Sequence, residues 1–281
     1  MIRLVALDLD GTTFGGDTRV SPAVRAAIAA TQAKGVAVTL ATGRMFTSTR
    51  PIAADLGIRV PLICYQGALV RDPVSAATLF YRPLAADVAL EVIALLQAQG
   101  LHAQFYLDDV LYVDEWNPGT TIYVGLNKDI RVETIGDPVA FLRAQGSDPT
   151  KISVVLADEA ATDALVAHLK GRFGDRLYAT KSHPIFAETI NPTCDKGVAL
   201  AALAAHLGVA QAEVLAVGDG DNDIPMLRWA GVGVAMGQAA ADVQAAADYV
   251  TASLTEDGLA AALDRFVLSQ SQPNSNTETR R

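Results

Sequence analysis

The sequence predicts an α/β fold, with a doubly wound parallel sheet as the core and an inserted α+β unit as the cap. Short apolar strands alternate with helices at both ends of the 281-residue chain, and this alternation is typical of a parallel sheet with right-handed crossovers. Between the two ends, short aromatic-rich strands follow one another as hairpins do, which indicates a separate α+β unit. We expect residues 1–82 and 186–268 to form the core, residues 83–185 the cap, and residues 269–281 a disordered tail.

The first part of the core contains three expected strands, each followed by turn-forming residues. Residues 2–7 are mostly apolar, partly β-branched and end before a Gly-Thr-Thr turn, so they predict a buried strand. A helix is expected over residues 22–34, because Ser21 can cap its N-terminus and Gly35 can end it. Further strands are expected at residues 36–40 and 60–64, with a helix between them that ends at Leu56.

The middle of the chain departs from this alternation after Arg82-Pro83. Residues 84–99 have helical spacing and stop at Gly100. Strands are expected at 103–107, 110–113, 130–135 and 152–156, helices at 138–145 and 160–173, and a turn at 116–119. Five aromatic residues are expected in the core of the cap, with one or two of them facing the cleft: Phe105, Tyr106, Tyr112, Trp116 and Tyr123.

The strand–helix alternation is expected to resume near residue 186. Helices are expected at 196–207 and 223–230, and strands at 214–217, 232–235 and 249–250, while residues 259–268 close the core. The chain from residue 269 onward is rich in Ser, Gln, Asn and Thr and lacks apolar periodicity, which is why this tail is expected to be disordered.

Composition excludes several classes of protein. A net charge of −9 argues against a nucleic-acid surface, which needs basic patches. No apolar run approaches the ~18–20 residues that cross a bilayer, and the chain begins directly with a core strand, so no signal peptide is expected. The two cysteines, Cys64 and Cys194, provide no disulfide framework. We expect a cytoplasmic protein that binds small molecules rather than nucleic acid or membranes; its oligomeric state is left open.

Two carboxylates, Asp8 and Asp10, follow the first strand. Open α/β sheets bind their ligands at this end of the strands, and two acids beside a buried edge repel each other unless a cation lies between them. A second strand runs into Gly218-Asp219-Gly220-Asp221-Asn222-Asp223. If the two strands are neighbours, Asp8, Asp10 and Asp219 surround one cation, with Asp223 as a further candidate. Oxygen ligands alone favour Mg²⁺ over zinc.

This arrangement suits phosphoryl chemistry. A carboxylate can attack phosphorus and form an aspartyl-phosphate, which divides a difficult hydrolysis into two steps, and Asp8 is placed for this role. Asp10 lies two residues along on the same face of an extended segment. It could protonate the leaving oxygen and then activate water, as a general acid that becomes a base. A cation would draw Asp8 and a phosphate oxygen together.

Four segments in this order resemble the haloacid dehalogenase superfamily of phosphatases, and more narrowly its Cof-type branch, subfamily IIB. They are Asp8-Leu9-Asp10-Gly11-Thr12, Thr42-Gly43-Arg44, Lys196-Gly197-Val198-Ala199-Leu200 and Gly218 to Asp223. Residues 231–237 and 256–258 also resemble that branch. The resemblance covers both parts of the core, up to about residue 268, and weakens in the expected cap.

The resemblance implies a role for each matching residue. Asp8 would be the nucleophile and a metal ligand, and Asp10 the acid/base, with its backbone carbonyl on the metal. Asp219 would bind Mg²⁺ directly, and Asp223 would lie behind it or bind through water. Phosphate oxygens would contact the Leu9 amide, Thr42, the Gly43 amide, Lys196 and Asn222. Thr42-Gly43 is expected at a helix N-terminus, which binds anions, and Lys196 would offset charge on the transferring group.

Two glutamines depart from the pattern of the branch. Gln66-Gly67 and Gly237-Gln238 stand where Asn-Gly and Gly-Asn are usual. The extra methylene changes the reach of the amide, so these residues are expected either at the pocket edge, where they affect substrate choice, or as simple loop variation.

Three further residues have alternative interpretations. Arg44 is either a second phosphate cation or a partner of a carboxylate, and the second role is favoured. His183 is favoured as a loop histidine over a substrate contact. Cys194 is favoured as a buried thiol over a nucleophile, since no histidine motif adjoins it.

The predicted function is a Mg²⁺-dependent phosphatase that hydrolyses small phosphorylated metabolites through an aspartyl-phosphate intermediate. By resemblance, sugar phosphates are the favoured substrates and phosphorylated cofactors the second class. The motifs do not separate hydrolysis from phosphotransferase or phosphomutase activity on sugar phosphates. A receiver domain that stores phosphate on Asp8 is disfavoured by the cap and the paired acidic strands. A non-catalytic sugar-phosphate-binding regulator is disfavoured by the intact Asp8, Asp10, Lys196 and Asp219.

Overall fold

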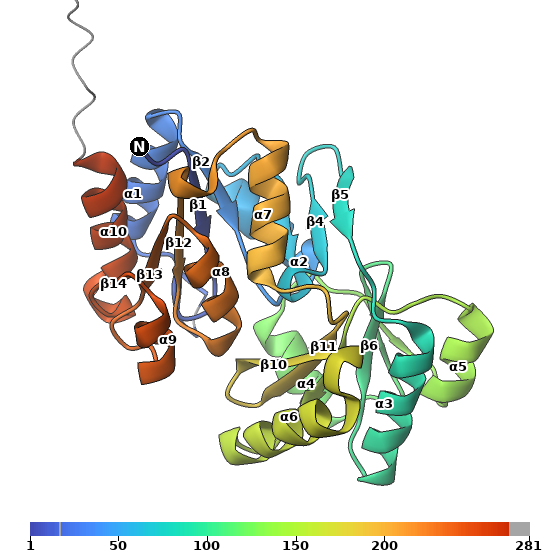
Figure 1. Cartoon of the computed structure of the whole chain (residues 1–281). Coiled ribbons are helices and arrows are strands. Elements are labelled where there is room, and N and C mark those ends of the chain that lie inside the picture. Colours follow the sequence, from blue (N-terminus) through green and yellow to red (C-terminus); the bar gives the residue numbers. More distant parts are fainter. Residues whose placement is uncertain (17, 270–281) are drawn as a thin grey trace, which may run out of the picture.

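A five-stranded parallel sheet forms the centre of the core, in the order β14-β13-β12-β1-β2 (Figure 1). The computed structural model describes residues 1–16 and 18–269, so the expected tail beyond residue 269 lies outside the described residues. The strands are β1 (Leu4–Leu7), β2 (Ala37–Leu40), β12 (Val214–Gly218), β13 (Val232–Ala235) and β14 (Tyr249–Val250). Because β2 and β12 flank β1 in parallel, with Leu7 opposite Leu40 and Val217, the residues that follow β1 and β12 lie at the same edge.

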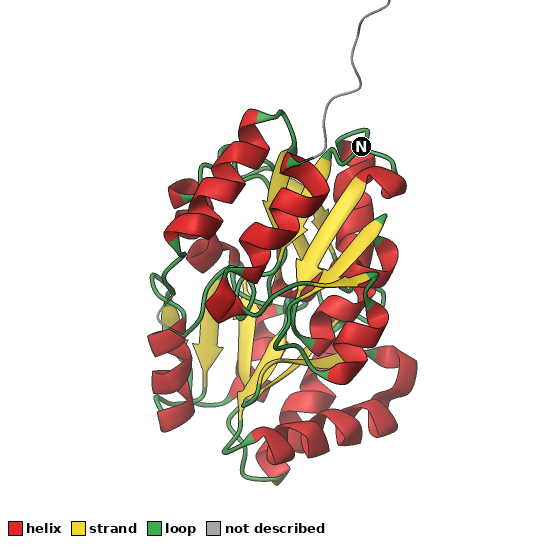
Figure 2. Cartoon of the chain, turned by 90° about the vertical axis from the view of Figure 1, so that its left-hand side faces the viewer, coloured by secondary structure: helices red, strands yellow, loops and turns green. Residues whose placement is uncertain are grey.

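Helices cover both faces of this sheet, as a doubly wound fold requires (Figure 2). The core helices are α1 (Pro22–Ala33), α2 (Phe46–Asp55), α7 (Lys196–His206), α8 (Ile224–Trp229), α9 (Ala241–Ala246) and α10 (Gly258–Leu263). Val5 and Leu7 of β1 pack in one apolar cluster with α1 and α10. Leu4 and Ala6 pack on the opposite face with α7 and α8. Burial of both faces explains why β1 is a continuous apolar run in the sequence.

The third strand of the core begins a small antiparallel sheet. It contains β3 (Leu62–Cys64), β4 (Leu69–Arg71) and β5 (Thr78–Tyr81), in that order. β3 adjoins the parallel sheet through a single parallel bridge between Ala41 and Ile63. The sequence predicted β3, over residues 60–64, but neither of its two partners, β4 and β5.

The cap contains a six-stranded sheet in the order β10-β11-β9-β6-β7-β8. The strands are β6 (Gln104–Leu107), β7 (Val110–Val113), β8 (Val132–Thr134), β9 (Ile152–Val155), β10 (Tyr178–His183) and β11 (Phe186–Ile190), and the helices are α3 (Ala86–Ala98), α4 (Pro118–Leu126), α5 (Pro138–Gln145) and α6 (Glu159–Phe173). The pairings are antiparallel apart from β7 with β8. Tyr106 and Tyr123 share an apolar cluster with Leu9 and Phe14 of the core, so one face of the cap packs on the core.

Helix α4 replaces the turn expected at residues 116–119. The Asn117 side chain accepts a hydrogen bond from the Thr120 amide at 2.9 Å, and Pro118 occupies the first helical position. Both are helix-start signals that the turn interpretation overlooked. Trp116 precedes the helix with 55% of its surface exposed, so its expected place in the cap core is wrong, whereas Phe105 and Tyr106 are fully buried.

The parallel alternation does not resume at residue 186. β11 pairs with β9 and β10 in the cap sheet, and the next core element is α7. An apolar strand carries no signal of which sheet it joins, so its partner could not be predicted from the sequence. We propose that the cap extends to about residue 190. Within residues 1–16 and 18–269, no helix has both the length and the apolar character needed to cross a membrane.

Candidate active site

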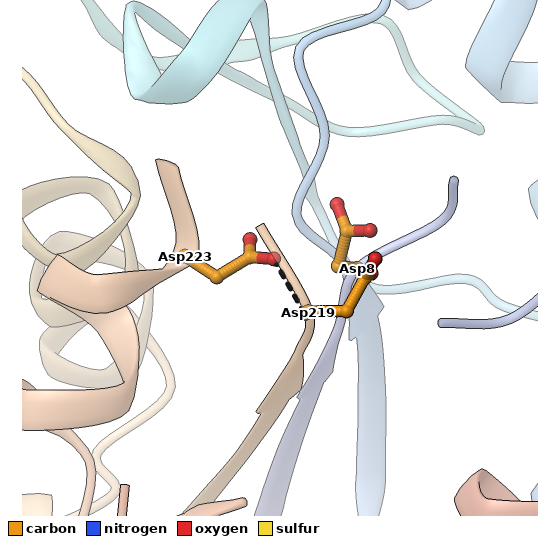
Figure 3. A group of neighbouring side chains, drawn as sticks. All are labelled: Asp8, Asp219 and Asp223. Atoms are coloured by element: carbon orange, nitrogen blue, oxygen red, sulfur yellow. Dashed lines mark hydrogen bonds between the residues drawn. The ribbon is translucent and has the colours of Figure 1, made fainter. Parts of the chain in front are cut away.

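Three carboxylates gather at the C-terminal edge of the parallel sheet. Asp8 follows β1, Asp219 follows β12, and Asp223 lies in the adjoining turn η4 (Asp221–Asp223) (Figure 3). One oxygen from each lies within 4.8 Å of one from each of the others. The Asp223 carboxylate also accepts hydrogen bonds from the Asp219 and Gly220 amides, both at 2.9 Å. Two segments that lie far apart in the sequence, one after β1 and one after β12, thus form one acidic cluster.

The loop after β1 is folded to make this approach possible. The Leu9 carbonyl accepts hydrogen bonds from the Thr13 and Phe14 amides, which turns the chain back. Thr12 Oγ1 then donates to Asp219 Oδ1 at 2.6 Å. Gly11 has φ +94°, and a Cβ there would overlap the Asp219 carboxylate. The Gly-Thr pair that follows Asp10 therefore links the two strand ends.

Lys196 places a positive charge inside the cluster. Its side chain is fully buried at the start of α7, and its Nζ lies 2.6 Å from Asp8 Oδ1 and 2.5 Å from Asp223 Oδ1. Burial alone would lower the pKa of Lys196, but Asp223 and Asp8 outweigh that effect and raise it. The lysine is therefore charged and offsets part of the repulsion among the carboxylates.

The remaining negative charge calls for a cation. Burial, and then the charge of Asp223, raises the pKa of Asp8 well above its usual value, and the same two causes raise the pKa of Asp219 to about 7. A cluster of this kind must hold either a proton or a metal ion. The donor group consists of carboxylates alone, which suits a hard cation such as Mg²⁺.

Asp10 does not join this cluster through its side chain. Its two oxygens accept hydrogen bonds from Arg44 Nε at 2.7 Å and Nη2 at 2.6 Å. The carboxyl group is 39% exposed and lines the cavity described below. Arg44 is thus the partner of a carboxylate, which is the role favoured by the sequence. The third nitrogen of Arg44, Nη1, donates a hydrogen bond to the Leu126 carbonyl of α4 in the cap at 2.8 Å.

The expected phosphate ligands lie around the same point. Thr42, Gly43 and Asn222 line the cavity beside Asp8, while Leu9 and Lys196 are fully buried next to it. The expectation that Thr42-Gly43 lies at a helix N-terminus is wrong. Helix α2 begins only at Phe46, and the amides of Phe46 and Thr47 donate to the carboxylate of Asp109.

A cavity of about 470 Å³ lies between the core and the cap, and the acidic cluster is at its core side. The cap contributes one wall, formed mainly by Tyr123, Leu126, Asn127, His183, Phe186 and Glu188. The His183 and Phe186 rings lie 4.8 Å apart, and the Phe186 and Tyr123 rings 5.5 Å apart. This volume suits a small organic ligand, and one side of the wall is aromatic.

Comparison with known proteins identifies the family. The chain matches the family model of haloacid dehalogenase-like hydrolases over residues 5–263. It belongs to this family. The hydrolase is 29% identical to the 5-amino-6-(5-phospho-D-ribitylamino)uracil phosphatase YitU of Bacillus subtilis, which covers 94% of this chain and 97% of that protein. It is 31% identical to the HMP-PP phosphatase of Serratia proteamaculans, with 85% of each chain covered.

A solved structure agrees with this assignment. The hydrolase superposes on the HAD subclass IIB sugar phosphatase BT4131 with a TM-score of 0.80 and 25% identity, over 94% of this chain and 98% of that one. The parallel-sheet core with an antiparallel-sheet cap is therefore the architecture of this subclass. The hydrolase is a phosphatase of the haloacid dehalogenase-like family, with phosphorylated small molecules as its class of substrate.

The two unusual glutamines of this hydrolase have different surroundings. Gln238 lines the cavity. Its Nε2 donates to the Gly11 carbonyl at 2.7 Å, and its Oε1 accepts from the Leu254 amide at 2.9 Å. Gln66 is not at the pocket edge. It is 1% exposed and hydrogen-bonds Glu188 and Asn222.

His183 and Cys194 also have definite places. His183 ends β10 and lines the cavity, contrary to the favoured loop interpretation, and burial lowers the pKa of its imidazole. Cys194 is buried, and burial raises the pKa of its thiol to about 11, as expected of an inert cysteine.

Sequence reasoning missed the ionic residues that the cap contributes. Lys151 and Glu188 form a pair in which both side chains are essentially unexposed. Each is a charged residue beside or within an apolar strand, at Lys151-Ile-Ser-Val-Val and Phe186-Ala-Glu-Thr-Ile. A charge in such a run is a signal of a buried partner, although the sequence does not show which partner.

Proposed function

We propose that this hydrolase is a Mg²⁺-dependent phosphomonoesterase that forms an aspartyl-phosphate on Asp8. The observation that carries the proposal is the convergence of Asp8, Asp219 and Asp223 around Lys196, at the core side of a cavity whose opposite wall belongs to the cap. A nucleophilic carboxylate, a metal site and phosphate donors are then within one pocket, as a two-step phosphoryl transfer requires.

The metal would be held by Asp8, Asp219 and the backbone carbonyl of Asp10, with Asp223 behind them or acting through water. The all-carboxylate group and the raised pKa values of Asp8 and Asp219 support this assignment. When bound, Mg²⁺ supplies positive charge that offsets the carboxylates and polarises a phosphate oxygen.

In the first step Asp8 attacks phosphorus, and the bond from phosphorus to the ester oxygen breaks. Asp10 gives its proton to the leaving oxygen, so the alcohol departs neutral. In the second step Asp10 takes a proton from water, which attacks the phosphorus and releases Asp8 and inorganic phosphate. Arg44 donates one hydrogen bond to each oxygen of Asp10, and each oxygen keeps a further lone pair that can carry the proton.

The remaining residues bind and orient the phosphoryl group. Lys196 holds Asp8 in place and spreads charge from the transferring group, since it touches one oxygen of the nucleophile. Thr42, the amides of Leu9 and Gly43, and Asn222 are the proposed donors to the phosphate oxygens. These groups lie opposite the cap wall, so the leaving group would face the cap.

Sugar phosphates are the proposed first class of substrate, as for BT4131 among the solved structures. The aromatic wall of Tyr123, His183 and Phe186 favours a second class, phosphate esters of ring-bearing compounds, since such rings stack on aromatic side chains. The two curated relatives above are named for a phosphoribitylaminouracil and for HMP-PP, which supports this second class.

The test is release of inorganic phosphate from a panel of sugar phosphates and ring-bearing phosphate esters, with and without Mg²⁺. Asp8→Asn, purified under conditions that exclude the wild-type protein, serves as the blank. We expect release that needs both Mg²⁺ and Asp8. Phosphate transferred to a sugar acceptor, with little free phosphate, would instead favour a phosphotransferase or mutase. Near-normal turnover by Asp8→Asn would overturn the nucleophile assignment.

A further inference from the structure

A buried ion pair of the cap reaches the phosphate site of the core. Lys151 immediately precedes β9, and its Nζ lies 2.5 Å from Glu188 Oε1 on β11. The same Nζ donates to the Gly43 carbonyl at 2.8 Å. It also lies 4.8 Å from the centre of the Tyr106 ring and 5.8 Å from that of Tyr65. A lysine of the cap thus holds the loop that carries two proposed phosphate donors.

The second oxygen of Glu188 continues this contact into the core. Gln66 Nε2 donates to Glu188 Oε2 at 2.6 Å, and Asn222 Nδ2 donates to Gln66 Oε1 at 2.9 Å. All four side chains are buried, with exposures of 0% for Lys151, 2% for Glu188, 1% for Gln66 and 7% for Asn222. The chain of hydrogen bonds ends at a residue that lines the cavity.

The charges at one end fix the direction of every bond in this chain. An ammonium group only donates and a carboxylate only accepts, so Gln66 must turn its Nε2 to Glu188 and its Oε1 to Asn222. Asn222 must in turn offer Nδ2 to Gln66. One hydrogen of that nitrogen is used, and the other is left for the cavity. Without Glu188, either amide could flip and present its oxygen where a donor is needed.

Stability alone does not account for such a group. Charges that are removed from water lose much hydration energy, and a buried ion pair often contributes no more than well-packed apolar side chains of similar size. The position of this one, between the two proposed donors Gly43 and Asn222, points to a role in the site. Gln66, whose side chain is one methylene longer than that of the usual Asn, hydrogen-bonds both Glu188 of the cap and Asn222 of the core.

We propose that Lys151, Glu188 and Gln66 form a positioning relay, through which the cap orients the Gly43 loop and the Asn222 amide for binding phosphate. The three residues act through others and do not touch the substrate. The inference rests on the proposed function, since it assigns Gly43 and Asn222 to the phosphate site. Through this relay the cap would affect the affinity for phosphate itself, in addition to any selection of the leaving group by the cap wall.

The test uses two near-isosteric substitutions in the full-length protein. Glu188→Gln keeps the size of the side chain but replaces the carboxylate, which only accepts hydrogen bonds, with an amide, which can also donate them. Gln66→Met removes the amide and leaves the Lys151–Glu188 pair in place. Each should weaken binding of inorganic phosphate in the presence of Mg²⁺ about tenfold, as the loss of one well-oriented hydrogen bond does. Titration calorimetry measures the affinity, and competitive inhibition of p-nitrophenyl phosphate hydrolysis provides a second value.

Two controls separate orientation from stability. Gln104→Met removes another buried amide of the cap, one that accepts from Ser153 Oγ at 3.3 Å, and should leave the phosphate affinity unchanged. Glu91→Gln disrupts an exposed ion pair with Arg176 and should also leave it unchanged. Melting temperatures of all variants show whether a loss of affinity follows a loss of fold.

The outcomes distinguish the two proposals. If wild-type hydrolysis needs Mg²⁺ and Asp8 but both relay variants bind phosphate as the wild type does, the relay is wrong and the proposed function stands. If the wild-type protein shows no such hydrolysis and no Mg²⁺-dependent phosphate binding, the proposed function fails and the relay fails with it. A tenfold loss in the relay variants, absent from the controls, supports both.

Discussion

Arg44 binds both carboxylate oxygens of Asp10 and, through its third nitrogen, the carbonyl of Leu126. The first contact lies within the core, and the second reaches the C-terminal end of α4 in the cap. The guanidinium is 5.4 Å from the Phe14 ring, and its side chain is 9% exposed. One side chain therefore joins the proposed acid/base to a helix that forms part of the cavity wall.

Arg44→Lys should lower kcat about ten- to hundredfold with a smaller change in KM. An ammonium group cannot bind two carboxylate oxygens in the planar geometry of a guanidinium, so Asp10 would lose its fixed orientation. General acid–base catalysis contributes about 10²–10⁴-fold to rates, and a misplaced acid loses part of this. Steady-state kinetics with Mg²⁺ measures the effect.

Arg25→Lys is the matched control for this substitution. Arg25 pairs with Asp55 on the surface of the core, at 2.7 Å, and its replacement should leave kcat unchanged. A wild-type kcat in Arg44→Lys would show that Asp10 needs no bidentate partner.

The meeting of Asp8 and Asp219 could be predicted because both follow buried strands of a parallel sheet. Such strands end at one edge, so neighbouring strands bring their following residues together whatever their distance in sequence. The contact between Arg44 and Leu126 could not be predicted in this way. It depends on where the cap lies, and no local pattern in either segment encodes that position.

The same limit applies to the residues around β11. The sequence predicts that the strand–helix alternation of the core resumes near residue 186, yet β11 pairs with β9 and brings Glu188 to Gln66. Periodicity shows that a strand is buried but not which strand is its neighbour. The buried partners Lys151 and Glu188 were missed for this reason, although each charge in an apolar run indicated that some partner exists.

Mg²⁺ should stabilise the folded protein, and more strongly at pH 8 than at pH 5. The pKa of Asp219 is about 7 in the folded protein without metal, against 3.8 for an unperturbed aspartate. Between these values the folded state holds a proton that the unfolded chain has lost, so the free energy of unfolding falls as pH rises. Mg²⁺ replaces that proton and removes the penalty.

Thermal unfolding with EDTA or with Mg²⁺ tests this across the pH range. Mg²⁺ at a hundredfold excess over its Kd should contribute about 2.7 kcal/mol. Asp219→Asn should make the fall in stability between pH 4 and pH 7 smaller, with Asp8 accounting for the part that remains, and should abolish most of the Mg²⁺ effect. A melting temperature that is independent of Mg²⁺ at pH 8 would contradict a metal site at these carboxylates.

Gly11→Ala should cost more stability than Gly35→Ala, although both glycines have positive φ. Gly11 has φ +94° and Gly35 φ +78°, so each alanine would be strained. Only at Gly11 would the new Cβ overlap a side chain, the Asp219 carboxylate; at Gly35 there is open space. We expect a loss of about 1 kcal/mol at Gly35 and at least twice that at Gly11.

Urea unfolding gives the two stabilities, and the Mg²⁺ dependence of activity gives a second comparison. Gly11→Ala should also require more Mg²⁺ for half-maximal activity, because it displaces a proposed ligand. Equal losses of stability in the two variants, with equal Mg²⁺ requirements, would mean that the loop after β1 moves aside without disturbing Asp219.

Asp109→Ala should weaken the attachment of the cap to the core. The Asp109 carboxylate accepts from the Phe46 amide at 3.1 Å, the Thr47 amide at 2.8 Å and the Tyr65 hydroxyl at 2.5 Å. A residue of the cap therefore caps the N-terminus of α2 in the core, whose own N-cap residue has no side-chain bond. Loss of such a cap costs about 1 kcal/mol.

Asp137→Ala is the control that separates the loss of a helix N-cap from the loss of the contact between the cap and the core. Asp137 caps α5 within the cap, where it accepts from the Val139 and Ala140 amides at 2.9 and 3.0 Å. Both variants should lose about 1 kcal/mol in urea unfolding, for the same reason. Only Asp109→Ala should also raise KM, because it frees the cap edge that adjoins the N-terminus of α2 in the core. If KM rises equally in both or in neither, the contact of Asp109 with α2 stabilises the helix without positioning the cap.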